Sequence, residues 1–214
     1  MKPGRDVFET LIPAALSLAE TDGWNSLTVS AVVAEAKLTL KDVGGPLVKD
    51  ELSAAVDPYF DTAMAEGSFD PDETARTRLF DVIMMRFEKM EDHRDGLMAF
   101  MRWRDRSLAG LNLRVRARKA TARWALTCVG LDRSGPLPTG LQVVGLGLVL
   151  ARAERAWRQE TSADLTRTMA ALDAALLQAE ERVTWLARRK GRKTSSETSE
   201  SDPAQDAPEE ANPA

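Results

Sequence analysis

The chain has 214 residues, which is enough for one or two modest domains with a hydrophobic core. Hydrophobic residues make up 43% and charged residues 29%, and no apolar run is long enough to span a membrane. A single cysteine excludes an internal disulfide framework, and a formal net charge of -4 provides no general attraction to nucleic acid. The N-terminus lacks the apolar core of a signal peptide, so we expect a cytoplasmic protein.

Helical periodicity of apolar residues prevails along the chain, whereas the period-2 pattern of strands is scarce. The pattern predicts helices over residues 6–21, 27–36, 49–65, 70–92, 96–107, 111–129, 139–160 and 162–187. Pro13 should kink the first helix or delay its start, and Pro58 should break the third. Asp70-Pro71 is a favourable opening for the long fourth helix, and Ser162 can cap the last one.

The stretch from Thr28 to Leu52 has the layout of a helix-turn-helix, the motif that places a short helix in the DNA major groove. Asp22-Gly23 should end the first helix, and Ser26 or Thr28 should cap the second. The segment LIPAALSLAETDGWNSLTVSAVVAEAKLT resembles the N-terminal domain of TetR-family regulators. The positions that carry the resemblance are Ala14, Ala15, Leu16, Leu18, Gly23, Trp24, Thr28, Val29, Val32, Ala36, Leu38 and the run 49–52.

The resemblance implies that Thr28, Lys37, Thr39, Lys41 and Lys49 would contact DNA phosphates. This part of the chain is nevertheless acidic, because residues 1–60 hold five basic and nine acidic side chains.

The recognition segment, residues 40–47, departs from the family pattern. Lys37 replaces the usual glycine of the turn, Gly44 stands where a phosphate-contacting tyrosine is usual, and Leu47 takes the place of an anchoring phenylalanine. Each helical glycine costs about 1 kcal/mol and an interior proline about 3 kcal/mol, so Gly44-Gly45-Pro46 predicts a recognition helix of one turn. Two interpretations follow: a regulator with weakened DNA binding, or a retained fold that no longer reads DNA.

A second resemblance lies further along. Residues 74–102 and 160–176 are similar to bacterial proteins related to the lipid-binding accessory protein of ubiquinone biosynthesis, which has a TetR-like fold. The shared pattern is an arginine-rich helix start, an apolar and aromatic run, His93-Arg94, and a Thr-Ser-x-Asp cap before a Met-Ala-x-Leu-Asp helix. This resemblance implies a lipid- or partner-binding protein without DNA binding.

Flexible and aromatic apolar side chains recur at helical spacing in the middle of the chain. Such a stripe is typical of a core, and it could also line a pocket between helices for an apolar small molecule or a lipid. The candidate pocket residues are Met84, Phe87, Met98, Phe100, Met101, Trp103 and Trp124.

The positive charge of the chain is concentrated in residues 102–123, which hold eight basic side chains and one acidic. On a helix, Arg114 and Arg118 would share one face, while Arg116, Lys119 and Arg123 would form a second row. The pattern fits a solvated face paired with acidic neighbours, and equally a contact with an anionic membrane surface or an acidic partner.

Catalytic and metal sites are not expected. His93 and Cys128 are the only residues of their types, so no zinc ligand set can form from them, and nucleophile elbows and phosphate loops are missing from the sequence. We therefore expect a non-enzymatic protein without a cofactor.

The predicted fold is all-α and TetR-like. Residues 1–52 would form the helix-turn-helix module, 53–190 a helical regulatory and dimerisation domain, and 191–214 a disordered acidic tail. The apolar helix at 139–151 and the helix after Ser162 predict a four-helix homodimer interface or, alternatively, a face that docks a different protein.

Overall fold

A computed structural model describes residues 5–67, 70, 72–132 and 137–199. These residues are arranged as nine α-helices with two short 3₁₀ helices and no strand, which confirms the all-α prediction. The elements in chain order are α1 (Arg5–Asp22), η1 (Trp24–Ser26), α2 (Val29–Glu35), α3 (Leu40–Val43), α4 (Lys49–Asp61), η2 (Thr62–Ala65), α5 (Ala75–Glu91), α6 (Arg94–Arg104), α7 (Leu108–Cys128), α8 (Thr139–Trp157) and α9 (Thr166–Ser199).

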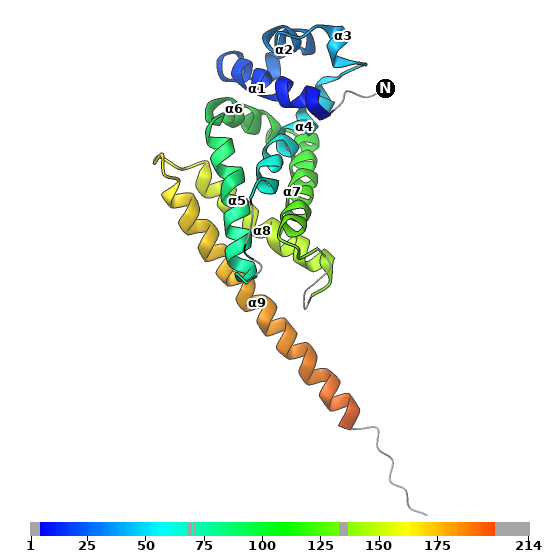
Figure 1. Ribbon diagram of the computed structural model, residues 1–214, viewed down its shortest axis with the longest axis vertical. Coiled ribbons are helices and arrows are strands. Elements are labelled where there is room, and N and C mark those ends of the chain that lie inside the picture. Colours follow the sequence, from blue (N-terminus) through cyan, green and yellow to red (C-terminus); the bar gives the residue numbers. More distant parts are fainter. Residues whose placement is uncertain (1–4, 68–69, 71, 133–136, 200–214) are drawn as a thin grey trace, which may run out of the picture.

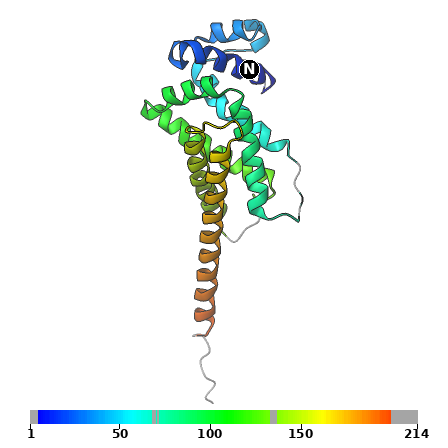
Figure 2. The ribbon, with the colours of Figure 1, turned by 90° about the vertical axis from the view of Figure 1, so that its left-hand side faces the viewer.

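The molecule is elongated, with α1, α2 and α3 at one end (Figure 1). Helices α4 to α8 form its middle, and the C-terminal half of α9 projects from the opposite end without a neighbouring helix in either view (Figure 2). The predicted boundary between residues 52 and 53 falls inside α4. One cluster of buried apolar side chains runs from Leu11 on α1 to Leu176 on α9, so the core is continuous across that boundary.

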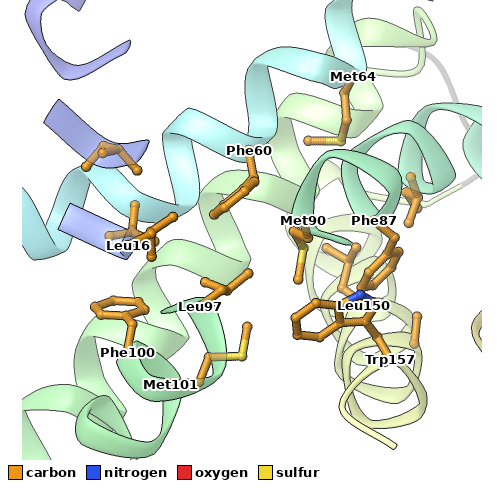
Figure 3. Close-up of a cluster of buried hydrophobic side chains, with 14 of the residues drawn as sticks. Leu16, Phe60, Met64, Phe87, Met90, Leu97, Phe100, Met101, Leu150 and Trp157 are labelled. Atoms are coloured by element: carbon orange, nitrogen blue, oxygen red, sulfur yellow. The ribbon is translucent and has the colours of Figure 1, made fainter. Parts of the chain in front are cut away.

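The core of the middle section consists of large apolar side chains from several helices (Figure 3). Phe60 and Met64 come from the α4–η2 segment, Phe87 from α5, Phe100 from α6 and Trp157 from the end of α8. All five are at most 1% exposed. Burial of each such side chain stabilises the folded state by roughly 1.5–3 kcal/mol, so this cluster contributes strongly to the packing of the helices.

The helix-turn-helix end is attached to the middle section by a close backbone approach. A Cβ atom added at Gly96 of α6 would lie 2.1 Å from the carbonyl oxygen of Leu16 on α1, so only glycine permits this crossing. Beside it, the Trp24 ring lies edge-on to Phe100, with 4.6 Å between ring centroids. The Trp24 indole donates a hydrogen bond to Ser53 on α4. These contacts fix α1 against α6, and η1 against both α4 and α6.

Several predicted helix boundaries differ from the structure, either because a proline is tolerated inside a helix or because a different residue caps it. Helix α1 starts at Arg5 despite Pro13, and α4 continues through Pro58 to Asp61. Helix α5 begins after Thr74, whose hydroxyl accepts a hydrogen bond from the Thr77 amide, and not at Asp70-Pro71. A proline removes one backbone donor without ending a helix whose other bonds and packing persist.

The last helix also begins and ends differently from the prediction. Ser162 does not cap it directly. The Glu160 carboxylate accepts hydrogen bonds from the amides of Thr161, Ser162 and Thr168, and α9 starts at Thr166. At its other end α9 continues to Ser199, so the part of the predicted disordered tail from 191 to 199 is helical. The sequence explains this extension, because residues 192–199 contain neither glycine nor proline. The rest of the predicted tail, 200–214, lies outside the described residues.

Candidate functional site: a shortened helix-turn-helix and a buried ionic network

The first half of the helix-turn-helix has the expected geometry. Thr28 is the N-cap of α2, and its hydroxyl accepts a hydrogen bond from the Ala31 amide. The turn after α2 places Lys37 in the left-handed region with φ of 56°. A side chain in this conformation costs about 1 kcal/mol relative to glycine. The chain therefore retains the turn of the motif, although Lys37 stands in place of the glycine that would adopt this conformation without cost. The Lys37 side chain is exposed.

The recognition helix α3 is four residues long, or about 6 Å at 1.5 Å per residue. Thr39 caps it, and Asp42 completes a capping box by accepting hydrogen bonds from the Thr39 amide at 2.7 Å and hydroxyl at 2.6 Å. These bonds lower the pKa of Asp42 below its usual value. Gly44, with φ of +76°, ends the helix. The Asp42 carboxylate is therefore engaged by its own helix, and the single turn agrees with the sequence prediction.

The helix-turn-helix module has few basic side chains, and they differ in how accessible they are to DNA phosphates. Lys41 is exposed on α3. The Lys49 ammonium donates a hydrogen bond to the Asn25 carbonyl at 2.8 Å and lies 6.0 Å from the centroid of the Trp103 ring. Partial burial lowers the pKa of Lys49. Of the five predicted phosphate contacts, two hydroxyl groups cap helices, one ammonium is bound to the protein, and Lys37 and Lys41 remain directed to solvent.

The predicted pocket residues mostly lie in the core. Met84, Phe87, Phe100 and Met101 are buried, as Figure 3 shows for the last three, and Met98 packs partly buried against the same cluster. Trp103 also packs partly buried against this cluster.

Trp103 has its centroid 6.1 Å from that of Trp24 and is partly exposed. Trp124 is 37% exposed and donates its indole N–H to the Asp61 carbonyl. Six of the seven residues therefore lie in or against the core cluster, and none of the seven lines either of the two cavities described below.

A group of buried charges, which the sequence patterns did not reveal, connects α4 to α5, α6 and α7. The Arg86 guanidinium, 7% exposed, donates to Asp61 at 2.7 Å and to Asp57 at 2.9 Å. Arg104, 1% exposed, donates to the other oxygen of Asp57 at 3.0 Å. The Thr121 hydroxyl donates to Asp61. Asp57 and Asp61 of α4 are therefore held by partners on three other helices.

The same network continues from Arg104 to the end of α8. Glu154 receives hydrogen bonds from Arg118 of α7 and from Arg158, which is the C-cap residue of α8. Arg158 also donates to Asp105 at 2.8 Å. The Arg104 guanidinium lies 3.7 Å from Glu154 and 3.7 Å from Asp105. We call this set, together with Arg114 bound to Asp105 at 3.0 Å, the ionic network.

The network controls the protonation of its members. Burial opposes the charged form of Glu154, yet the adjacent guanidinium groups of Arg118, Arg158 and Arg104 lower its pKa to about 2. At Asp61 burial dominates and raises the pKa, although Arg86 and Thr121 favour the carboxylate. Glu154 is thus ionised across the whole range of ordinary pH.

One signal in the sequence could have revealed the network. Arg86 is four residues from both Val82 and Met90, so it occupies the apolar face of α5 where a solvated arginine would not be expected.

The basic helix α7 divides its charges between two sides. Arg114 and Arg118 take part in the ionic network. Arg116, Lys119 and Arg123 are exposed. The predicted basic face is therefore two surfaces, one structural and one directed to solvent.

A cavity of about 630 Å³ lies where α1 and α2 meet the junction of α5 and α6. Its lining includes His93 and five carboxylates, those of Glu20, Glu35, Glu91, Asp92 and Asp95. Partial burial lowers the pKa of His93, and its Nε2 lies 3.4 Å from the Tyr59 hydroxyl. The described residues contain no cluster of three or more potential metal ligands and no helix suited to crossing a bilayer.

The arrangement of helices is that of TetR transcriptional regulators. The crystal structure of the TetR transcriptional regulator from Nitrosomonas europaea ATCC 19718 superposes with a TM-score of 0.64 at 17% sequence identity, over 81% of this chain and 98% of that one. Neither a scan against protein-family models nor a search of curated proteins gave a match. The fold predicted from the helix-turn-helix residues is confirmed, and the resemblance to ubiquinone accessory proteins stays a prediction.

Proposed function

We propose that this protein is a TetR-like transcriptional regulator with weak DNA binding, without a cofactor and without catalytic activity. The observation that carries the proposal is the order α2, turn, α3 on a TetR fold, with Thr28 and Thr39 capping the two helices and Val43 anchoring α3 in the core. This is the framework that sets a recognition helix against DNA. The weakness follows from a recognition helix of one turn whose only free cation is Lys41 among its described residues.

The strength of phosphate binding can be estimated from the exposed lysines. If Lys37 and Lys41 each neutralise one phosphate, the logarithm of the binding constant falls against the logarithm of salt concentration with a slope of about -1.8 for one module and about -3.6 for a dimer. That slope is shallow. Proteins that make six to ten phosphate contacts have steeper slopes and lose about 10³–10⁵ in affinity between about 50 mM and 200 mM salt.

A salt titration of DNA binding tests this function. Genomic fragments, including the region upstream of the protein's own gene, are compared with random DNA by fluorescence anisotropy from 20 mM salt upward. Lys41→Gln should reduce the slope by about 0.9 per module, whereas Lys119→Gln on α7 should leave it unchanged. Absence of binding above the random-DNA level at the lowest salt would refute the regulator.

We further propose that the regulator is a homodimer joined through α8. Leu141, Val144 and Leu148 follow each other at helical spacing, and each is more than half exposed. Gly145 lies beside them with open space at its Cβ position, which permits close approach of a second helix. Leu148→Glu should convert the dimer to a monomer in sedimentation velocity, while Leu108→Glu, at an exposed position on α7, should not. A monomeric parent protein would exclude the interface.

A lipid- or partner-binding protein associated with ubiquinone biosynthesis is the alternative function. The exposed row of Arg116, Lys119 and Arg123 favours it, because these side chains lie on a helix that also exposes Val115. The protein should then sediment with vesicles containing anionic lipid but not with neutral ones, and mass spectrometry should find a co-purifying isoprenoid or other apolar molecule. Equal sedimentation with both vesicles, or repeated preparations without lipid, would count against this alternative.

A further inference from the structure

The ionic network contains more positive than negative charge. Five guanidinium groups (Arg86, Arg104, Arg114, Arg118 and Arg158) face four carboxylates (Asp57, Asp61, Asp105 and Glu154). Arginine stays protonated in proteins, so the excess charge cannot be removed by proton loss. Arg86 and Arg104 are at most 7% exposed, whereas the side chains of Arg114, Arg118 and Arg158 are 21–30% exposed. A charge that is largely removed from water and lacks a counter-charge is costly, and proteins normally compensate it with a partner.

The guanidinium groups also have buried donors that lack acceptors among the described residues. The Nε–H groups of Arg104, Arg114 and Arg158 are inaccessible to solvent and donate no hydrogen bond to the described residues. Arg104 is the clearest case because its side chain is 1% exposed, and the nearest carboxylate oxygen to its Nε, that of Asp105, is 3.7 Å away. A buried N–H without an acceptor costs about 1–3 kcal/mol, and more for a charged group.

A small cavity lies at the centre of this network. Its volume is about 10 Å³, and its lining comprises Asp57, Arg86, Arg104, Arg114, Arg118, Thr121, Leu150 and Glu154. Four of these residues carry guanidinium groups and two carry carboxylates. The space admits about one water-sized group, so only a small ligand can enter it. The excess of guanidinium groups over carboxylates in the lining favours an anion.

We propose that this cavity is a binding site for one small monovalent anion, either chloride or the carboxylate group of a small organic acid. The anion would accept hydrogen bonds from the guanidinium groups of Arg104, Arg114 and Arg118 and bring the network to charge balance. It would connect α6 and α7 at the place where Glu154 already joins them to α8. The site rests on the ionic network alone and does not depend on DNA binding.

The experiment measures unfolding of the purified full-length protein at constant ionic strength. Sodium methanesulfonate, whose tetrahedral sulfonate group is bulkier than a chloride ion or a planar carboxylate group, is replaced stepwise by sodium chloride or by sodium acetate. A site that binds only the folded state shifts the unfolding equilibrium by the factor 1 + [L]/Kd, about 11-fold at ten times Kd. We expect a saturating rise of that kind with at least one of the two salts.

Two variants on α7 separate site binding from general salt effects. Arg114→Gln removes one donor and the excess charge, and the saturating rise should disappear. Arg116→Gln, two residues away and exposed, should retain the parent response. Saturation with chloride alone identifies an inorganic anion, and saturation with acetate alone identifies a carboxylate. Equal, unsaturated responses to all three salts would overturn the proposal, as would an Arg114→Gln variant that behaves like the parent.

A second measurement does not depend on the folding of any variant. Crystals of the parent protein grown in bromide should show an anomalous peak in the cavity between Arg104 and Arg118. Bromide found only on the outer surface, with the cavity empty or filled by water, would refute the inorganic form of the site. The same crystals soaked in bromoacetate would test the carboxylate form. DNA is absent from all these assays, so their failure would leave the proposed regulator untouched.

Discussion

Replacing Glu154 by glutamine tests the ionic network where three guanidinium groups meet. Burial opposes ionisation of Glu154, but Arg118, Arg158 and Arg104 lower its folded-state pKa to about 2. Against an unfolded-state value of about 4.3, the difference of about 2.3 pH units corresponds to about 3 kcal/mol of stability. The side chain is 16% exposed, so solvent weakens this interaction little.

The pH dependence has a defined direction. Because the folded-state pKa is depressed, the stabilisation is complete above the unfolded-state pKa and is lost as the pH falls toward about 2. The Glu154→Gln variant should therefore unfold with about 3 kcal/mol less free energy at pH 7, and the difference should narrow to about 2 kcal/mol at pH 3.5.

Urea unfolding followed by tryptophan fluorescence at several pH values measures this difference. Glu88→Gln, at an exposed position of α5, should change stability by less than about 0.5 kcal/mol at any pH. A Glu154→Gln penalty that is the same at pH 7 and pH 3.5 would refute the electrostatic reasoning, because loss of packing or of a neutral hydrogen bond has no such dependence.

Three further changes test other parts of the structure. Gly110→Ala should cost about 2 kcal/mol and lower the melting temperature, because its Cβ would lie 1.8 Å from the Arg104 carbonyl oxygen; an unchanged melting temperature would show that α6 and α7 do not cross so closely. Thr39→Ala removes the N-cap of α3 and should destabilise that turn by about 1 kcal/mol, seen as faster amide exchange at Asp42, whereas equal exchange would mean that the cap has no effect. Burial raises the pKa of Cys128 to about 11, so about 0.1% of the thiol is ionised at pH 8; a disulfide reagent should react far more slowly with folded than with urea-unfolded protein, and equal rates would contradict this burial.

The fold was predictable from sequence where apolar spacing and local capping act together. Leu11, Ala15 and Leu16 on α1 form a stripe that needs only helical geometry to become a core face, and Thr28 caps α2 through a bond to a residue three positions away. The four-residue α3 followed from the cost of Gly44 and Gly45 in a helix. Each of these inferences depends on residues that are close in sequence.

Boundaries were less predictable where two caps compete. Asp70 and Thr74 both have side chains that can cap α5, and the structure uses Thr74. Asp70 instead accepts a hydrogen bond from the Asp72 amide and forms a local turn. At α9 the cap is Glu160, which lies eight residues before Thr168. A carboxylate so distant in sequence is not recognised by patterns that consider three or four positions.

The ionic network could not be predicted because its pairs are distant in sequence. Asp57 and Arg104 are 47 positions apart, and Arg118 and Glu154 are 36 apart. A charged residue in a sequence is most often solvated, so an arginine-rich helix such as α7 favours a surface interpretation. Only the packing of α7 against α8 separates Arg118, which is bound to Glu154, from Arg116, which is exposed.

The network and the helix-turn-helix share a mechanical connection through α4 and α6. Asp57 of α4 is bound to Arg86 and Arg104, and α4 continues directly from the segment that follows α3. At its other end α6 contacts α1 through Gly96, where no side chain separates the two backbones. Closely packed elements transmit small displacements because they cannot compress. A change in the charge balance at Arg104 would therefore act on both supports of the helix-turn-helix, α4 through Asp57 and α1 through α6.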